Sequence, residues 1–247
     1  MEVTFLNKFN EMLIYERDMD QLRALALWIT QYDGNPPIPS LYNPTNYVFN
    51  LIKYYSNIFA SEIMENNSIP AHAISRFHSA LASINTLLGI TRKDIVEAGQ
   101  MQRYRNSGFW EMRRFIGQFG DVAESVVADG VSHIIPAAVS GCIVGEYLGL
   151  KISEKYNRSV PIDHMVFARR GTEPISGHLS NDTFLIGNHI LLVDDAVMET
   201  VTGNVMLETI RAINPSAIIS LMAVEISPEA KSLGFLSQFS HVYTFDE

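Results

Sequence analysis

The chain of 247 residues is long enough for one large domain or for one domain with a sizeable extension. Hydrophobic residues make up 47% of the sequence and charged residues 18%, which excludes the composition of a disordered protein. Cys142 is the only cysteine, so an intrachain disulfide and a cysteine-rich metal cage are excluded. The net charge of −9 arises within residues 121–247, which contain 7 basic and 16 acidic side chains. This acidic half argues against a nucleic-acid-binding surface.

Two further classes are disfavoured by the apolar segments. Residues Met1–Asn10 lack a basic segment followed by an apolar one, so no secretory signal is expected and a cytoplasmic location is the default expectation. The longest apolar stretch, Val131–Leu150, contains His133, Pro136 and Glu146. A buried strand, loop and helix explain it better than a membrane span does.

Residues 1–120 are predicted to form an all-helical N-terminal region. One apolar stripe recurs at three- and four-residue spacing from Tyr47 to Ile63, as expected for a helix with one buried face. Further helices are expected over Ala71–Leu88, from Thr91 to Gly99, and over Phe109–Ala128 with a break near Gly117 and Gly120.

From Val131 onward the pattern changes to short apolar runs rich in β-branched residues. These predicted strands are Val131–Ile135, Met165–Ala168, His189–Val193 and Ala217–Val224. Predicted helices lie between some of them, at Ile143–Leu148 and Val205–Ile213. Strands that alternate with helices predict an α/β domain with a doubly wound parallel sheet over residues 121–247.

The most informative segment begins with the apolar run Ile190–Val193, which is followed by Asp194 and Asp195. In open parallel sheets, ligands bind at the carboxyl ends of the strands, where loops and helix N-termini converge. Ionised carboxylates accept hydrogen bonds from sugar hydroxyls, and the unpaired amides of a helix N-terminus suit a phosphate. The threonines and glycine after the acids add donors and allow a close approach. The segment therefore predicts a site for a phosphorylated sugar.

Other interpretations of the acid pair are possible. Response-regulator receiver domains also open with a strand and paired acids, but only 52 residues follow Asp195, too few for the rest of such a domain. A Walker B strand requires an upstream G-x-x-x-x-G-K-[ST] loop, which this sequence lacks. A purely structural role, in which the aspartates cap a helix or solvate a strand end, stays open.

The segment from Asn188 to Asn204 resembles the signature with which type I phosphoribosyltransferases bind 5-phosphoribosyl-1-pyrophosphate. Upstream, Val131–Gly141 resembles the first strand and pyrophosphate loop of that family, and Met165–Arg170 resembles its next strand. Residues Gly171–Asp182 occupy the position of the family's mobile catalytic loop, and we expect residues 172–182 to be mobile without ligand. The resemblance covers roughly residues 125–226 and implies the fold of that family.

The phosphate loop departs from the family's pattern. Aligned without a gap, Met198–Thr200 occupy the threonine- and glycine-rich positions; three extra residues would place Thr202–Asn204 there instead. The second alignment is favoured because Glu199 within a phosphate loop would repel the ligand. The mobile loop also lacks a lysine, which leaves His178 and the neighbouring arginines as its cationic candidates.

The resemblance implies a pentosyl-transferring enzyme that moves the phosphoribosyl group of phosphoribosyl pyrophosphate to a nitrogenous base, with Mg²⁺ as cofactor. It implies catalytic roles for Asp194, Asp195 and Arg170. It also implies that Mg²⁺ is held through the substrate, with water as the link from the ion to Asp194 or Asp195. The implied substrate-binding residues are Ala138, Val139, Ser140, Gly141, Arg169, His178, Thr200, Thr202, Gly203 and Asn204. The alternative is a non-catalytic sensor or regulator that binds the same ligand. We also expect a homodimer, because the helical half holds more apolar residues than a thin extension needs.

Overall fold

The computed structural model describes residues 21–23, 25–26, 44–66, 71–88, 113–170, 173–180, 183–185, 187–198 and 200–245. Residues 21–23 and 25–26 are helical, and the further helices are α2 (Pro44–Asn66), α3 (Ala71–Leu88), η1 (Arg113–Gln118), α6 (Phe119–Ala128), α7 (Ser140–Tyr156), α8 (Val201–Ile213), α9 (Pro228–Ser232) and η2 (Phe235–Gln238). Its strands are β1 (His133–Pro136), β2 (Val166–Arg170), β3 (Glu173–His178), β4 (His189–Val197), β5 (Ile218–Ile226) and β6 (Val242–Thr244).

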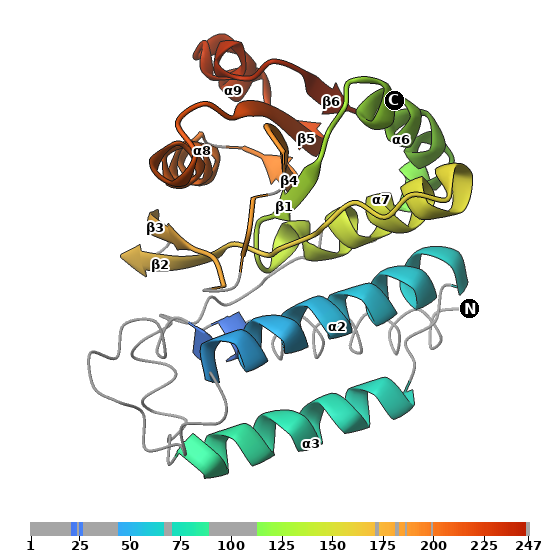
Figure 1. The fold of residues 1–247 in the computed structure, drawn as a ribbon, viewed down its shortest axis with the longest axis vertical. Coiled ribbons are helices and arrows are strands. Elements are labelled where there is room, and N and C mark those ends of the chain that lie inside the picture. Colours follow the sequence, from blue (N-terminus) through green and yellow to red (C-terminus); the bar gives the residue numbers. More distant parts are fainter. Residues whose placement is uncertain are drawn as a thin grey trace.

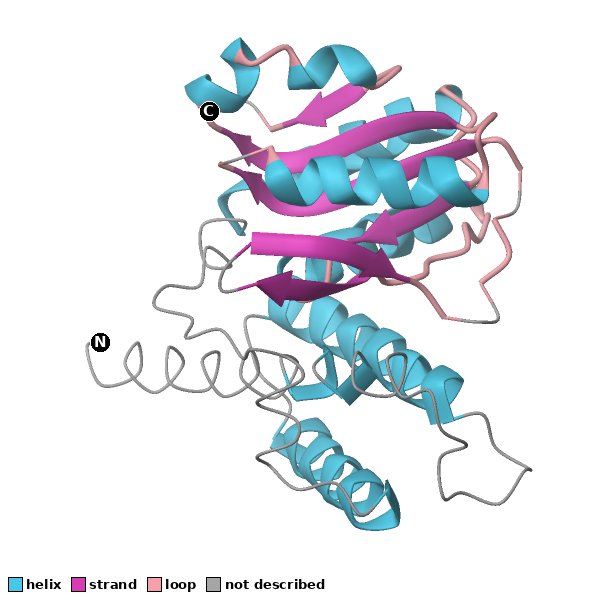
Figure 2. Ribbon diagram, turned by 90° about the vertical axis from the view of Figure 1, so that its left-hand side faces the viewer, coloured by secondary structure: helices cyan, strands magenta, loops and turns pink. Residues whose placement is uncertain are grey.

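The main sheet is parallel, with the strand order β1-β4-β5-β6 (Figure 2). Strand β4 lies inside the sheet, between β1 and β5. Helices α6 and α7 pack with a core cluster on one face, and α8 and η2 pack with a second cluster on the other. A parallel sheet covered by helices on both faces confirms the predicted α/β class.

The segment Met165–Ala168, expected as a strand of the main sheet, is an exception. Only its first residue joins that sheet, in an isolated parallel bridge between Met165 and Ala137. From Val166 the chain instead pairs antiparallel with β3 in a separate two-stranded sheet. Strand β3 also occupies half of the segment Gly171–Asp182 that was expected to be a loop, because the backbone of β2 supplies the hydrogen-bond partners for it. Residues 172, 181 and 182 lie outside the described residues, and the mobility of this segment stays a prediction.

The helical region packs against the α/β part rather than standing apart from it. Figure 1 shows α2 lying along α7, with α3 on the far side of α2. The predicted stripe of α2 is confirmed at Val48, Ile52, Tyr55 and Phe59, which are buried, but not at its first residue, Tyr47, which is exposed. The four buried residues belong to the same core cluster as α7 and β1, so apolar packing continues across the predicted boundary near residue 120.

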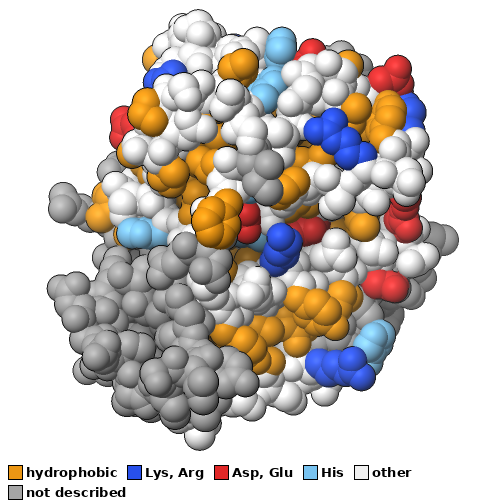
Figure 3. Space-filling model, viewed as in Figure 1, with side chains coloured by type: hydrophobic (Ala, Val, Ile, Leu, Met, Phe, Trp, Pro, Cys, Tyr) orange, Lys and Arg blue, Asp and Glu red, His pale blue; other side chains and the backbone are white. Residues whose placement is uncertain are grey.

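The exposed side of α2 carries apolar groups. Tyr47 and Tyr54 are exposed, and Figure 3 shows hydrophobic side chains gathered in the lower half of the molecule, where α2 lies. The expected helix from Thr91 to Gly99 lies outside the described residues. Within the described chain, no helix is both long and apolar enough to span a bilayer.

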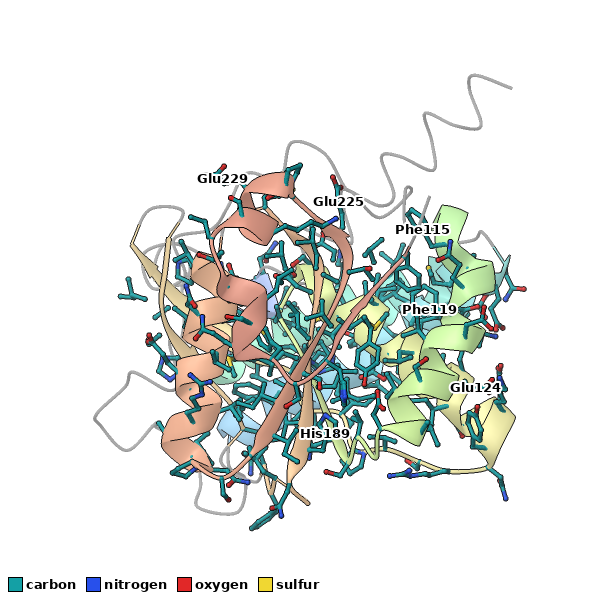
Figure 4. All side chains as sticks on the ribbon, turned by 90° about the horizontal axis from the view of Figure 1, so that it is seen from above. Phe115, Phe119, Glu124, His189, Glu225 and Glu229 are labelled. Atoms are coloured by element: carbon teal, nitrogen blue, oxygen red, sulfur yellow. The ribbon has the colours of Figure 1, made fainter. Side chains whose placement is uncertain are left out.

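The expected helix Phe109–Ala128 begins, in its described part, as the 3₁₀ helix η1 and continues as α6 from Phe119. This change of helix type lies between Gly117 and Gly120, where a break was predicted. The rings of Phe115 and Phe119 pack against Phe245, with centroids 5.5 and 4.8 Å away. Figure 4 labels Phe115 and Phe119, which belong to η1 and α6. This contact attaches η1 and α6 to the segment that follows β6.

Candidate functional site

The acid pair lies within β4, close to its carboxyl end. The strand continues to Val197, so the expectation that it ends in the two aspartates is wrong in detail. It continues because β5 offers backbone partners as far as Ile226. On the other side, pairing with β1 stops at Pro136 opposite Val193, immediately before the acids. Asp194 and Asp195 therefore lie just beyond the end of β1, at the carboxyl edge of the sheet.

The two carboxyl groups have different environments. Asp194 is 7% exposed, and its Oδ1 accepts hydrogen bonds from Ser140 Oγ at 2.6 Å and from the Asp195 amide at 3.0 Å. Burial raises the pKa of Asp194, and the neighbouring charge of Asp195 raises it further. Asp195 is only partly buried, and its Oδ1 accepts from the Ala196 amide at 2.8 Å. Asp195 is thus the more accessible acid of the pair.

The loop between β1 and α7 comes next to these acids. The Ala138 amide donates to the Met165 carbonyl at 2.8 Å. The Gly141 amide donates to the carbonyl of Ala137, at the start of the loop, also at 2.8 Å. The peptide bond between Ala138 and Val139 is cis. Among the described residues, no acceptor lies against the amides of Val139 and Ser140. Of the four amides expected to face pyrophosphate, two are therefore already used within the protein.

Gly141 allows α7 to begin directly against β4. A Cβ at this position would collide with the Val193 carbonyl oxygen and would lie 3.1 Å from the Asp194 Cα. Gly145, one turn later, has the same function against the ring of Pro136. Gly141 thus brings the first turn of α7 into contact with β4, the strand that carries the acids, and Gly145 brings the next turn against β1.

The connection between β4 and α8 is shorter than the preferred alignment assumed. Helix α8 begins at Val201, so Thr202, Gly203 and Asn204 belong to its first turn rather than to a loop. A Cβ on Gly203 would collide with the Phe235 ring, which assigns this glycine to packing against η2. Residues 198–200 make the connection, which is the segment that the ungapped alignment matches to the phosphate loop.

Thr200 is the residue before α8, and its carbonyl accepts from the Asn204 amide at 2.9 Å. Its hydroxyl lies 3.3 Å from Asn204 Nδ2, which donates to it. Met198 is 54% exposed, and its carbonyl accepts from Ser227 Oγ at 2.8 Å. Glu199 lies outside the described residues. The connection is thus short and attached to the segment after β5, and it contains no glycine.

The cationic candidates lie on the β2–β3 hairpin. Arg169 and Arg170 pair with Pro174 and Glu173 in the backbone register, and their side chains lie outside the described part of the structure. His178 contacts Ser176 Oγ through Nε2 at 3.0 Å, and burial lowers the pKa of His178. A neutral imidazole offers no positive charge near pH 7.

The position of His178 also separates it from the acids. The neighbouring Gly177 lies against Thr209, since a Cβ on the glycine would come within 2.7 Å of the Thr209 hydroxyl. Thr209 belongs to the second half of α8, whereas the acid pair and Thr200 lie near the beginning of that helix. No described contact joins His178 to either aspartate.

A second buried acid was not singled out as a site by the sequence analysis. Glu146 is 2% exposed; its Oε2 accepts from Asn57 Nδ2 at 3.1 Å, and His164 Nε2 lies 3.4 Å from its Oε1. Burial raises the pKa of Glu146 to about 7 and lowers the pKa of His164 to about 3. The available signal was a glutamate inside an apolar stretch, but its partners come from distant parts of the chain.

No protein-family model matches this sequence, and no curated protein matches it. Solved structures are similar over part of the chain. A purine phosphoribosyltransferase from Pyrococcus horikoshii is 16% identical, with a TM-score of 0.41, over 56% of this chain and 86% of its own. The adenine phosphoribosyltransferase of Saccharomyces cerevisiae is 15% identical, with a TM-score of 0.41, over 57% of this chain and 81% of its own. A hypoxanthine-guanine phosphoribosyltransferase from Bacillus anthracis is 15% identical, with a TM-score of 0.40, over 53% and 76%.

Proposed function

We propose that this chain binds 5-phosphoribosyl-1-pyrophosphate and transfers its phosphoribosyl group to a nitrogenous base, with release of pyrophosphate. The observation that carries the proposal is the position of Asp194 and Asp195 on the inner strand β4, beside the start of α7 and ahead of α8. This edge of an open parallel sheet is where ligands bind. The order of strand, acids, connection and helix is the order of the phosphoribosyltransferase signature.

The proposed roles follow from the hydrogen-bond donors and acceptors of each group that remain available to a ligand. Asp195 accepts hydrogen bonds from the ribose hydroxyls, because it is the more accessible acid. The amides of Val139 and Ser140 donate to pyrophosphate, and Thr200 with the first turn of α8 binds the 5-phosphate. The positive end of the dipole of α8 also favours a phosphate there. Positioning and electrostatic stabilisation of the departing pyrophosphate would supply the rate enhancement.

Arg169 and Arg170 are proposed to offset the charge of the pyrophosphate. They close β2 at the turn toward β3, at the opposite end of the strand from Met165, whose carbonyl accepts from the Ala138 amide. The support for this role is therefore the family resemblance, in which a basic residue follows this strand. The acceptor base is proposed to lie beneath the helical region. Two contacts support this: Arg23 Nη1 donates to the Phe167 carbonyl at 3.1 Å, and Ser180 Oγ donates to Asn46 Oδ1 at 2.8 Å.

The family resemblance implies Mg²⁺, and the donor set fits an ion shared with the substrate. The described residues contain no group of three or more His, Cys, Asp or Glu side chains able to hold a metal. Mg²⁺ is commonly bound by one or two carboxylates together with substrate phosphates and water, and Asp195 supplies such a carboxylate. When bound, the ion would neutralise charge on the pyrophosphate.

A second candidate is a sensor that binds phosphoribosyl pyrophosphate without consuming it. The β4–α8 connection favours the sensor. This connection is short (Met198–Thr200), it contains an acidic residue, and it has no glycine that would let the backbone approach a phosphate closely. A site with weaker contacts to the 5-phosphate would position the ribose less firmly for transfer. The helical region would then provide the surface for a partner.

Incubation with labelled phosphoribosyl pyrophosphate, Mg²⁺ and a panel of purine, pyrimidine and unusual bases tests both candidates. Transfer predicts base-dependent release of pyrophosphate and one labelled nucleotide, both lost in Asp195→Asn. Binding without base-dependent release would support the sensor instead. Absence of binding at millimolar ligand in wild type would overturn both.

A further inference from the structure

We propose that Asp194 is a positioning residue that holds the β1–α7 loop through Ser140, and that Asp195 alone meets the ligand. This inference rests on the proposed function for the ligand's identity, but the loop attachment that it describes can be measured without ligand. In the phosphoribosyltransferase signature both acids follow the strand, so the sequence gives no reason to separate their roles.

The first observation is the direction of the Asp194 contacts. Its Oδ1 accepts from Ser140 Oγ at 2.6 Å and from the Asp195 amide at 3.0 Å, so this oxygen is engaged within the protein. With only 7% of its surface exposed, Asp194 offers little to a ligand in solvent. Asp195 accepts from the adjacent Ala196 amide by Oδ1, and its carboxyl group also interacts with that of Asp194. It is nevertheless the more exposed of the two acids.

The second observation is that Ser140 provides the only side-chain hydrogen bond available to the loop. Ala137, Ala138 and Val139 have apolar side chains, and Gly141 has none. The backbone of the loop is attached at its beginning, where the Ala137 amide donates to Val193 and the Ala138 amide to Met165. Its end, at the first residue of α7, is attached to β4 by the bond from Ser140 to Asp194.

The third observation is the close packing at the same point. Because Gly141 lies against Val193 and Asp194 with no room for a Cβ, the first turn of α7 sits directly on the strand. The Ser140–Asp194 bond fixes the adjacent amides of Val139 and Ser140, for which no acceptor lies among the described residues. Donors fixed before binding lose less entropy when a pyrophosphate arrives. Asp194 thus acts on the ligand through the loop.

Four variants separate the two roles. Ser140→Ala removes the hydroxyl, whereas Ser140→Thr keeps it. Asp194→Asn keeps a side-chain oxygen that accepts from Ser140, whereas Asp195→Asn changes the accessible acid. Ser216→Ala is the matched control, because it removes an exposed hydroxyl that donates to Asn214 Oδ1 at 2.9 Å, far along the chain from the loop.

Hydrogen exchange measured by mass spectrometry on the free protein tests the attachment. Exchange over residues 137–142 is expected to become roughly 5- to 30-fold faster in Ser140→Ala, the effect of one strong hydrogen bond, and to stay near wild type in Ser140→Thr and Asp194→Asn. Unchanged exchange in Ser140→Ala would overturn the proposal, whether or not the protein binds phosphoribosyl pyrophosphate.

Calorimetric titration with phosphoribosyl pyrophosphate and Mg²⁺ tests the division of roles. Asp195→Asn is expected to lose far more affinity than Asp194→Asn, and Ser140→Ala is expected to lose roughly 5- to 30-fold with recovery in Ser140→Thr. Equal losses in Asp194→Asn and Asp195→Asn would overturn the proposal and make Asp194 a ligand-binding acid. If wild type shows no binding, the proposed function fails while the exchange experiment still decides the loop attachment.

Discussion

Two buried carboxyl groups of this protein, Asp194 and Glu146, have much in common and different surroundings. Each lies within the α/β part, each is less than a tenth exposed, and burial raises the pKa of both. Each also accepts a hydrogen bond from a distant element, from Ser140 at 2.6 Å for Asp194 and from Asn57 at 3.1 Å for Glu146.

The difference lies in their neighbours. Asp194 is followed by the partly exposed Asp195 at the open edge of a sheet, beside two amides without a described acceptor. Glu146 is enclosed by α2, by its own helix α7 and by His164. Burial and a raised pKa are therefore common to a candidate ligand site and to an internal packing contact. The accessible neighbour, Asp195, distinguishes the candidate ligand site from the packing contact. Measuring both stability and ligand affinity in variants of Glu146 and Asp195 tests this distinction.

The largest expected effect is on stability. Glu146→Ala should lower the free energy of unfolding by about 2–4 kcal/mol, because it leaves the Asn57 amide without its buried acceptor and creates a cavity. Affinity for phosphoribosyl pyrophosphate should change little while the protein is folded. Urea denaturation measures the loss, with Glu154→Ala as control, an exposed acid of the same helix paired with Lys151 at 2.9 Å. Equal stability of the two variants would contradict an enclosed role for Glu146.

The reverse result is expected for the accessible acid. Asp195→Asn should weaken the binding of phosphoribosyl pyrophosphate with Mg²⁺ by about 10- to 150-fold, the loss of one charge-assisted hydrogen bond. The thermal midpoint should move little, because the amide is isosteric and Asp195 is only partly buried. Calorimetric titration and a melting curve on the same variant decide the matter. A large fall in the midpoint with unchanged affinity would give Asp195 the role assigned here to Glu146.

The pH dependence of stability should report Glu146. Its folded pKa is raised from 4.5 to about 7, so between these values the folded state binds more protons than the unfolded state. Stability from this group is complete below pH 4.5 and is lost as the pH rises through 7. His164, with a pKa lowered to about 3, has the opposite effect below its ordinary value of 6.5.

Subtracting a variant isolates the glutamate from the histidine. The difference in unfolding free energy between wild type and Glu146→Gln should fall by about 1–3 kcal/mol between pH 4.5 and 8. Urea denaturation at several pH values measures it. A difference that stays constant over this range would mean that Glu146 is ionised throughout in the folded protein.

The smallest expected effect concerns the β4–α8 connection. Glu199→Gly should raise affinity for phosphoribosyl pyrophosphate by roughly 2- to 5-fold, because it removes a negative charge from the segment aligned with the phosphate loop and adds a flexible residue. Calorimetric titration at low salt is the measurement, with the exposed Glu208→Gln on α8 as the control. Weaker binding in Glu199→Gly would show that the glutamate supports the site.

The sequence pattern predicted the elements that depend on local signals. The apolar run Ile190–Val193 identified β4, and the stripe from Tyr47 identified α2, because hydrophobic periodicity records which faces are buried. The extension of β4 to Val197 was missed, since it depends on the backbone of β5 rather than on apolar side chains. Strand β3 was read as a loop because it occupies the position of the family's mobile loop and because Gly171 and Gly177 suggested hinges, whereas its pairing with β2 is set by the fold.

Site details that depend on packing between distant segments were also missed. The sequence analysis interpreted Gly203 as a glycine of the phosphate loop. In the structure, the Phe235 ring, 32 positions away in the chain, explains why no side chain fits at this position. The contact of Glu146 with Asn57 and His164 likewise joins three separate parts of the sequence. The acid pair was predicted because its signal is contiguous in the sequence, and the division of labour within the pair needed the position of Ser140.

The central claim is that the edge of the sheet at Asp195 binds phosphoribosyl pyrophosphate. Calorimetric titration of the wild-type protein with this ligand, with and without Mg²⁺, tests it most directly. We predict saturable binding that requires Mg²⁺ and falls about 10- to 150-fold in Asp195→Asn. Binding of equal strength in wild type and Asp195→Asn, or no heat of binding at millimolar ligand in wild type, would contradict the claim.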